Sequence, residues 1–516
     1  MESDRFLRLV NIHSEKKSLI FHPFIFSCLP ILFSLAFNAH EISIDDIIVP
    51  IIISITIAFI FWIILRHFVG GVKSGLVVSF LILLFVIYGN MHTELQSNHS
   101  EIIQFIGSNV ILGSVFLVIG ILGIIIIKKT KSQKEFNSIL NVIAITIIAI
   151  LIFNVMLYYV STPSDFTILN FIEIPITIND VKKKPDVFLF ILDEFAGERQ
   201  LKMDFDYDVS PFKKELEKRN FSIPDESFSN YPNTVFSLPS TMNMVYMENL
   251  IEKFGPVTKD KKFSIQLLAQ NNVMKIFKSQ GYKTTTFHNG LPEKYIIPDS
   301  QYVDERLCSD DRLDINHELK EIFIATYLPI TIFNHQLITP LYYYHDECIF
   351  SYIQNYESDD KQPHFIHTHI SLPHMPYRYD SEGNPTTLQG KTKNEYVNQV
   401  IFTEKKILEL IDSIQNKSSE SVIILISDHG FRNEIDWENP TDEDLMRGFN
   451  NISALYFPNK DLVLPEKLSL VNIFRIFFNE YFNAEFEILD DKHIWYQSNP
   501  FFHFDATDKI NTLIKK

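Results

Sequence analysis

The chain has 516 residues, of which 46% are hydrophobic, and a formal net charge of −17 at pH 7. This length accommodates a membrane region together with one large globular domain. Residues 1–160 carry 10 Lys and Arg against 9 Asp and Glu, whereas residues 161–516 carry 36 against 54. A second part this acidic argues against nucleic-acid binding, because phosphate backbones require a basic surface.

Long apolar stretches fill the part of the chain before residue 160. There are five of them, at residues 19–37, 47–65, 74–88, 109–127 and 139–160. A bilayer crossing needs roughly 20 apolar residues, so the third stretch is the shortest candidate. No small-residue cleavage site follows the first stretch, which argues against a signal peptide. We therefore predict a five-helix transmembrane domain over residues 1–160.

The connections between these stretches differ in charge. Basic residues lie in the N-terminal tail and in the second-to-third and fourth-to-fifth connections: Arg5, Arg8, Lys16, Lys17, Arg66, Lys73, Lys128, Lys129, Lys131 and Lys134. Residues 40–46 are acidic, and residues 91–101 contain no Lys or Arg. The positive-inside rule then puts the N-terminus in the cytoplasm. Five crossings predict a multi-pass protein of the cytoplasmic (inner) membrane whose C-terminal domain is extracytoplasmic.

Residues 161–184 have the character of a linker, with two prolines and three consecutive lysines before the first strand-like run. Two continuous apolar runs follow, at residues 187–193 and 421–428, and each ends in a carboxylate; a third run, at residues 364–370, mixes apolar residues with histidines. Such runs are typical of strands in a parallel sheet that is covered on both faces.

Helical patterns at residues 264–280 and 394–415 lie between these runs. Alternating strands and helices predict an α/β domain over residues 185–516, with a mainly parallel sheet between helices. In such sheets, ligands bind beyond the carboxyl ends of the strands.

Acidic residues and a histidine stand at two of the predicted strand ends. Asp193 and Glu194 end the first run, and Asp428 and His429 end the last, followed by Gly430. An Asp and a His at a strand end can both reach one divalent metal ion, and zinc and manganese accept such mixed oxygen and nitrogen ligands, with calcium a further option. A polar turn after a strand would have the same residue types.

A hydroxyl-rich segment precedes a predicted helix start. It contains Thr234, Ser237, Pro239 and Ser240, and proline suits the first turn of a helix. A hydroxyl at a helix N-terminus lies where anions bind, and metal coordination would make it a nucleophile. A simple helix cap is the structural alternative for Thr234.

Three histidines lie within eight residues: His367, His369 and His374. They could bind metal, hold a phosphate or protonate a leaving group. Strand alternation puts His367 and His369 on one face, where a buried structural histidine fits equally well. The C-terminal part also contains two cysteines. Cys308 and Cys348 could form one disulfide in an oxidising compartment or remain two thiols.

Taken in chain order, these segments resemble the sulfatase-like membrane phosphotransferases, namely lipid A phosphoethanolamine transferases and lipoteichoic acid synthases. The resemblance implies five membrane helices before an extracytoplasmic domain of the alkaline-phosphatase type. It implies that Asp193, Thr234, Asp428 and His429 form the metal site, with Thr234 as the nucleophile. His374 and His369 match active-site histidines of that family.

The expected reaction is therefore transfer of a phosphoethanolamine-type or phosphoglycerol-type group. The donor would be a membrane phospholipid, and the acceptor a glycan or lipid of the cell envelope. Hydrolysis of a phosphate or sulfate ester is the alternative; a sulfatase would need an Arg where Thr241 follows Ser237 and Pro239. An inactive membrane scaffold is disfavoured, because no expected ligand is replaced by an inert residue.

Overall fold

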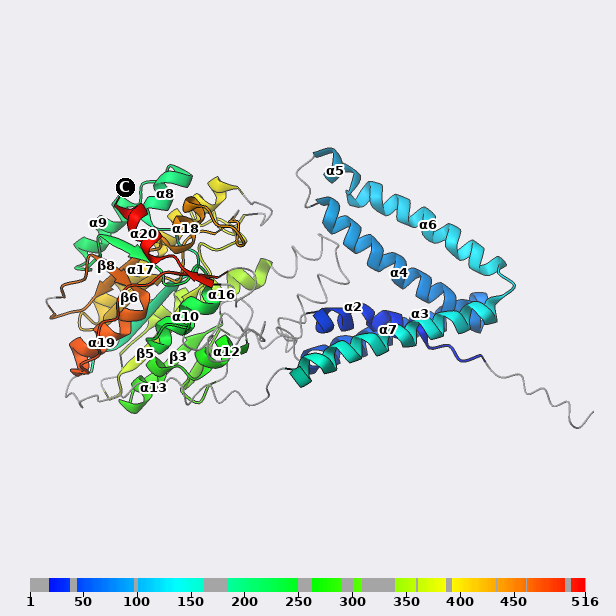
Figure 1. Cartoon of the computed structure of the whole chain (residues 1–516), viewed down its shortest axis with the longest axis horizontal. Helices are drawn as coiled ribbons and strands as arrows, with labels where there is room; N and C mark the ends of the chain where they lie inside the picture. The colour runs from blue at the N-terminus through cyan, green and yellow to red at the C-terminus, as the bar shows by residue number, and fades with distance from the viewer. Residues whose placement is uncertain are drawn as a thin grey trace, which may run out of the picture. The chain divides into compact units, whose positions relative to one another are not determined.

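The computed structural model describes most of the chain (Figure 1): residues 18–37, 44–96, 101–161, 184–248, 262–288, 300–308, 339–358, 361–386, 392–432, 435–460, 462–496 and 503–515. These residues belong to two units, a helical one before residue 163 and an α/β one whose described part begins at Lys184. The predicted linker at residues 161–184 lies almost wholly outside the described residues. The order of helices followed by an α/β domain agrees with the predicted fold class.

The helical unit consists of α2 (His22–Phe37), α3 (Ile44–Val69), α4 (Gly71–Gln96), α5 (Glu101–Ile106), α6 (Asn109–Lys129) and α7 (Gln133–Ser161). Four of these helices, α3, α4, α6 and α7, are long and apolar enough to cross a membrane, and α2 is shorter. Their outward-facing side chains are mostly exposed Ile, Leu, Val and Phe, as lipid contact requires.

Two stretches differ in length from the sequence-based expectation. The third one lies in the 26-residue helix α4, which continues beyond Tyr88 through polar residues to Gln96. The first one forms only the 16-residue α2, because the chain becomes helical at His22. There the backbone N–H groups of Phe21 and His22 donate to Oδ1 of Asn141 on α7, at 3.3 and 3.0 Å.

The α/β unit is built on a six-stranded sheet in the order β4-β3-β5-β1-β6-β7. Its strands are β1 (Val187–Leu192), β3 (Lys283–Phe287), β4 (Glu305–Leu307), β5 (His364–Ile370), β6 (Val422–Ser427) and β7 (Ser453–Tyr456). All neighbouring pairs are parallel except β6 with β7. Leu192 at the end of β1 is in register with Ile370 and Ser427, so the three central strands end together.

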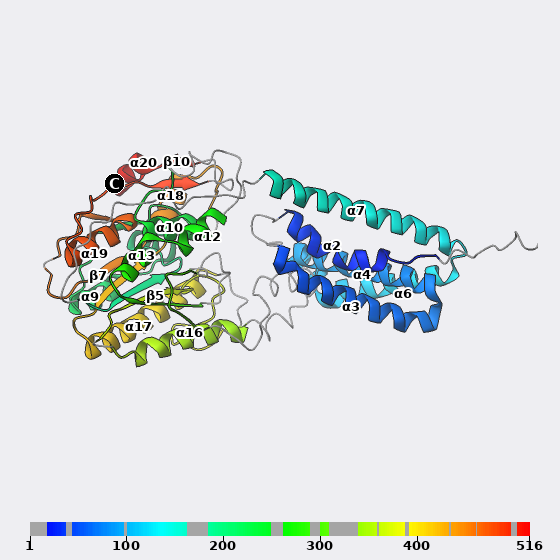
Figure 2. The same ribbon diagram turned by 90° about the horizontal axis from the view of Figure 1, so that it is seen from below.

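Helices cover both faces of this sheet (Figure 2). Side chains of β1 alternate between two hydrophobic clusters: Phe188, Phe190 and Leu192 belong to one, and Leu189 and Ile191 to the other. The first cluster includes residues of α8 (Glu198–Phe205), α9 (Ser210–Lys218), α16 (Thr339–Asn355) and α17 (Lys393–Lys417). The second includes residues of α10 (Thr234–Asn243), α12 (Lys262–Ala269), α13 (Asn272–Ser279) and α19 (Ile473–Phe482).

Smaller elements complete the unit: β2 (Glu226–Phe228) beside β8 (Lys467–Ser469), β9 (Ile494–Tyr496) beside β10 (His503–Asp505), α18 (Asp442–Phe449), η3 (Leu470–Asn472) and α20 (Thr507–Ile514). The three predicted strands correspond to β1, β5 and β6, and the helix predicted at residues 394–415 lies within α17. The helix predicted at residues 264–280 is instead two helices, because the side chain of Asn271 caps α13 by accepting from the N–H of Met274. Cys308 and Cys348 form a disulfide.

Candidate active site

Four of the predicted site residues meet where β1, β6 and α10 come together. Asp193 directly follows β1, Asp428 and His429 follow β6, and Thr234 is the first residue of α10. Because β1 and β6 are adjacent and in register, Asp193 and Asp428 leave the sheet side by side. All four side chains are buried. This is the carboxyl edge of the sheet, where open α/β folds bind their ligands.

The Thr234 hydroxyl lies between a carboxylate and an imidazole. Its Oγ1 donates to Oδ2 of Asp428 at 2.7 Å and is 3.1 Å from Nε2 of His429. Nδ1 of His429 is 2.8 Å from the carbonyl oxygen of Gly430. Since a carbonyl oxygen only accepts, Nδ1 carries the proton and the Nε2 lone pair faces the cluster.

Local structure holds Thr234 in this place. Asn233, rather than Thr234, caps α10, with its Oδ1 accepting from the N–H of Phe236 at 3.1 Å. The Thr234 side chain is therefore not needed as a cap. Ser237 donates to the backbone carbonyl of Asp428 at 2.6 Å and ties α10 to the end of β6. The expectation that Pro239 occupies the first turn is wrong: it lies inside α10, which begins five residues earlier.

Gly430 allows the chain to turn beneath the site. A Cβ atom at this position would lie 2.1 Å from the carbonyl oxygen of Arg447 and 2.5 Å from that of Asn450. Any side chain would therefore push the Asp428–His429 segment away from α18 and the residues after it.

Asp193 and His369 extend the cluster. Nε2 of His369 is 3.7 Å from Oδ2 of Asp193, and Nε2 of His429 is 3.8 Å from its Oδ1. That Oδ1 atom is buried and has no hydrogen-bond partner among the described residues. One ligand atom each from Asp193, His369 and Asp428 lies within 4.8 Å of the others. These residues fit a divalent metal ion, and the nitrogen donors suit zinc or manganese better than calcium, which prefers oxygen ligands.

The electrostatics of the cluster agree with such a site. Burial and the neighbouring Asp428 carboxylate raise the pKa of Asp193. Burial alone would raise the pKa of Asp428 as well, but His429, His369 and the Thr234 hydroxyl outweigh it and lower that pKa. Burial lowers the pKa of His429 and keeps it neutral. A bound cation would relieve the repulsion between the two carboxylates.

Glu194 connects the cluster to two further residues, a role that no local sequence pattern indicates. Its backbone is left-handed, with φ of 62°, and its N–H donates to Oδ1 of Asp428 at 3.1 Å. Its carboxylate accepts from the backbone N–H of Arg432 at 3.0 Å and lies 3.6 Å from Nε2 of His374. Glu194 therefore faces His374 and Arg432, and a strained backbone of this kind is typical of functional sites.

His374 is the partly exposed histidine of the site, and its side chain is 24% exposed. Its backbone N–H donates to the carbonyl of Asp193 at 3.1 Å. Burial opposes its charged form, but the carboxylates of Asp193 and Glu194 raise its pKa overall. His367, by contrast, is fully buried, and burial together with His369 lowers its pKa to about 3. His367 thus matches the buried structural histidine that was one of the sequence alternatives.

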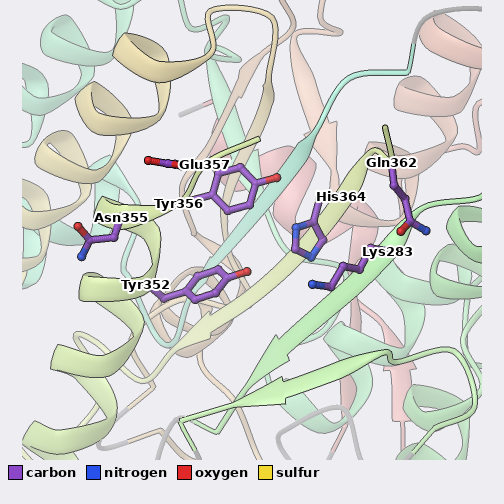
Figure 3. Close-up of a pocket in the computed structure, with 7 residues that line it drawn as sticks. All are labelled: Lys283, Tyr352, Asn355, Tyr356, Glu357, Gln362 and His364. Atoms are coloured by element: carbon purple, nitrogen blue, oxygen red, sulfur yellow. The ribbon is translucent and has the colours of Figure 1, made fainter. Parts of the chain in front are cut away.

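A separate polar pocket of about 280 Å³ lies at the other end of the strands (Figure 3). Lys283 and His364, which begin β3 and β5, point into it opposite Tyr352 and Tyr356. Strands rise about 3.3 Å per residue, so a six-residue strand separates this pocket from the cluster by roughly 20 Å. It is not part of the candidate active site.

Carboxylates, imidazoles and a hydroxyl gathered at the carboxyl ends of parallel strands form a candidate metal site of the kind that hydrolases and phosphotransferases use. Residues 185–451 match the family model described as Sulfatase, and the chain therefore belongs to the sulfatase family. The resemblance found in the sequence motifs is confirmed at this level. A search of curated protein sequences finds no match to the chain.

Several solved structures are similar to the chain. The C-terminal periplasmic domain of EptC from Escherichia coli has a TM-score of 0.42 and 14% identity, and the alignment covers 64% of this chain and 95% of that one. The lipoteichoic acid synthase LtaP from Listeria monocytogenes has a TM-score of 0.38 and 13% identity, covering 65% and 85%. The integral membrane lipooligosaccharide phosphoethanolamine transferase A from Neisseria meningitidis has a TM-score of 0.35 and 15% identity, covering 84% and 88%.

Proposed function

We propose that this membrane-anchored sulfatase-family enzyme transfers a phosphoethanolamine-type or phosphoglycerol-type group from a phospholipid to a hydroxyl of an envelope glycan or lipid. Thr234 would be the nucleophile. The observation that carries the proposal is the buried Thr234 hydroxyl, 2.7 Å from Oδ2 of Asp428 and 3.1 Å from Nε2 of His429. A hydroxyl that only capped its helix would have no reason to contact both groups.

The metal would be held by Asp193, Thr234, Asp428 and His429, with His369 as a further donor within reach. When bound, it supplies the positive charge that makes the hydroxyl acidic and offsets charge on the phosphate oxygens. Asp428 accepts the proton of Thr234, since the two are already hydrogen-bonded. Asp193 completes the negative charge that draws a cation to this edge of the sheet.

The reaction then takes two steps. The Thr234 oxygen forms a bond to phosphorus, and the bond from phosphorus to the lipid alcohol breaks. His374 gives the departing oxygen its proton, for which its partial exposure and raised pKa suit it. The hydroxyl of the acceptor then attacks the phosphothreonine and returns a proton to His374. The bond from phosphorus to the Thr234 oxygen breaks, and Asp428 gives its proton back to that oxygen.

Arg432 is placed to orient the substrate phosphate. Its Nε lies 3.8 Å from Oε1 of Glu194, and its guanidinium lies 6.0 Å from the centre of the Trp437 ring. Both contacts hold a planar cation beside the cluster, and no hydrogen bond joins its outer N–H groups to the residues that the structure describes. Two such groups can bind a phosphate through two hydrogen bonds.

Ser237 is the competing nucleophile, as in formylglycine sulfatases. It is buried, and its hydroxyl donates to the carbonyl of Asp428 at 2.6 Å while its own carbonyl accepts from Thr241 at 2.9 Å. Both groups serve the packing of α10, which favours Thr234.

The membrane topology supports action outside the cytoplasm. Basic residues lie at the facing ends of α3 and α4 and of α6 and α7, so these ends are cytoplasmic by the positive-inside rule. Helix α7 then leads to the opposite side, whether or not the short α2 also crosses. The disulfide between Cys308 and Cys348 agrees with an oxidising compartment.

The test uses the full-length protein in detergent with zinc or manganese. A chromogenic phosphodiester and a chromogenic sulfate ester are compared for the wild type, Thr234→Ala and Ser237→Ala. We expect phosphodiester turnover that Thr234→Ala abolishes and Ser237→Ala retains at least in part. Sulfate turnover that survives in Thr234→Ala and disappears in Ser237→Ala would overturn the proposal in favour of a sulfatase.

A further inference from the structure

The helical unit contains a cavity of about 880 Å³ between α2, α3, α4 and α6. This volume is in the upper part of the range of small-molecule sites, roughly 300–1,000 Å³. Its lining is almost entirely aliphatic and aromatic, and the polar side chains are Ser27, Ser54, Tyr88 and Asn109. Apolar cavities of this kind exclude water and accept apolar molecules.

One end of the cavity is polar. The hydroxyl of Tyr88 on α4 donates to Oδ1 of Asn109 on α6 at 2.5 Å, and the ring of the buried His92 lies 5.9 Å from the Tyr88 ring. Helix α6 runs from Asn109 to the basic pair Lys128 and Lys129. The polar end is therefore the end remote from the basic connections, which the positive-inside rule makes the extracytoplasmic end.

A glycine of α6 provides the room. A Cβ atom on Gly113 would meet nothing nearer than the Tyr88 hydroxyl at 3.9 Å, so Gly113 borders open space. Gly123 of the same helix is different, because a Cβ atom there would lie 2.2 Å from the Phe80 ring. Close helix packing therefore accounts for Gly123 and does not account for Gly113.

We propose that this cavity holds an acyl chain of a phospholipid from the extracytoplasmic leaflet, with the head group at the level of Tyr88 and Asn109. At this depth the surrounding solvent is hydrocarbon, so a lipid chain is the apolar molecule at hand. Tyr88 at this end of the cavity, with His92 beside it, matches the polarity of the head-group region. The proposal rests on the proposed function, since the bound lipid would be the phospho-group donor.

Photolabelling tests the site directly. The full-length protein is reconstituted in phospholipid vesicles containing a phospholipid with a diazirine in its acyl chain, irradiated, digested and mapped by mass spectrometry. We expect label on cavity residues such as Leu84 and Phe116, and loss of that label in Gly113→Leu. Val118→Leu is the matched control, because Val118 on the same helix is 56% exposed and does not line the cavity.

Label confined to outward-facing residues such as Val118, or cavity label that Gly113→Leu leaves unchanged, would overturn the assignment.

Kinetics connect the cavity to the reaction. A leucine at position 113 adds four carbon atoms beside the Tyr88 hydroxyl and takes room that a long bound chain needs. The effect is one of packing, because a displaced chain segment returns to hydrocarbon and not to water. We expect Gly113→Leu to lower kcat/KM for a dipalmitoyl donor about tenfold relative to a dihexanoyl donor. An unchanged ratio would overturn the donor role. If the wild type turns over no phosphodiester at all, the proposed function fails, while the photolabelling result still decides the cavity.

Discussion

Both ends of the central sheet have buried Asp and His side chains, but these side chains are hydrogen-bonded differently at the two ends. At the amino end, Asp186 precedes β1 and His364 begins β5, and both are buried. Oδ1 of Asp186 accepts from the N–H of His364 at 2.8 Å, and Oδ2 accepts from the hydroxyls of Tyr356 and Ser358 at 3.0 and 2.5 Å. Nε2 of His364 is 2.7 Å from the hydroxyl of Thr285.

At the carboxyl end, the acceptor atoms face one another. The imidazole nitrogen of His429 is 3.3 Å from Oδ2 of Asp428 and 3.8 Å from Oδ1 of Asp193, with no proton on that nitrogen to share. Burying such groups costs free energy unless something positive lies between them. The groups at the amino end therefore satisfy one another, whereas the groups at the carboxyl end fit a bound cation.

The largest effect is expected from a substitution at the carboxyl end of the sheet. Asp428→Asn keeps the shape of the side chain but removes the charge and the acceptor of the Thr234 proton. We expect phosphodiester turnover to fall about a thousandfold or more, because proton acceptance and charge stabilisation are lost together. The purified variant should also lose its bound zinc or manganese, measured by inductively coupled plasma mass spectrometry, and should melt no lower than the metal-free wild type.

A melting temperature below that of the metal-free wild type would make Asp428 a structural residue. Removing like-charge repulsion should instead leave the metal-free variant as stable as the metal-free wild type, or more stable.

The matching change at the amino end should have the opposite outcome. Asp186→Ala leaves the N–H of His364 and the hydroxyls of Tyr356 and Ser358 without their acceptor. Unsatisfied buried donors cost about 1–3 kcal/mol each, although two of these groups are hydroxyls that can rotate, so we expect a loss of about 3 kcal/mol in unfolding free energy. The measurement is chemical denaturation in detergent. Turnover per folded molecule and metal content should not change; a loss of either would place Asp186 in the active site.

Much of the carboxyl end could be predicted from sequence. Strands β1, β5 and β6 are buried on both faces. Strands β1 and β6 are continuous apolar runs, and the carboxylates that follow them, Asp193 and Asp428, mark the edge of the sheet. Parallel register then brings Asp193 and Asp428 together although they are far apart in the chain. The sequence signal is strong at this end because the same local pattern, a buried strand followed by a potential metal ligand, occurs on two strands that pair in register.

The remaining features depend on contacts that no local pattern encodes. The direction of Glu194 follows from a left-handed backbone and from Arg432, which approaches through the turn after β6. The network of Asp186 needs partners from the loop after α16 as well as from β5. The length of α2 depends on Asn141 of α7, which receives its first N–H groups.

Glu404 is a third buried carboxyl group, away from both ends of the sheet, and its raised pKa keeps it protonated at neutral pH. Glu404 on α17 accepts from the hydroxyl of Tyr207 at 2.7 Å, and burial raises its pKa to about 8 from the model-peptide value of 4.5. Between these values the folded protein holds a proton that the unfolded chain has released, so this contribution is complete below pH 4.5 and is lost as the pH rises to about 8.

Glu404→Gln keeps the acceptor for Tyr207 and removes the titration. We expect it to be more stable than the wild type by about 2 kcal/mol near pH 9, well below the roughly 5 that the full shift would give, because structure relaxes around a buried charge. Near pH 5 the two should be equal. Glu409→Gln is the control, since Glu409 is an exposed residue of the same helix, paired with Lys406. Equal pH profiles of melting temperature for wild type and Glu404→Gln would mean that Glu404 ionises normally.

The smallest effect is expected at Arg432, which we propose to bind the substrate phosphate at the carboxyl end of the sheet. Arg432→Gln should raise KM for the phosphodiester about tenfold and change kcat less, because a charge-assisted contact to phosphate is worth about 1.5 kcal/mol or more in both ground and transition states. Arg447→Gln is the matched control. Its side chain is 23% exposed, against 22% for Arg432, but it pairs with Asp204 on α8 rather than with the cluster.

Arg432→Lys separates charge from geometry. A lysine supplies the charge without the planar pair of donors, so a phosphate bound through two hydrogen bonds should show a KM between those of the wild type and Arg432→Gln. If Arg432→Lys instead had the KM of the wild type, the positive charge alone would account for binding of the phosphate. If Arg432→Gln matched the wild type, Glu194 would hold Arg432 only to balance its own charge, and the carboxyl end would bind its substrate through the metal and His374 alone.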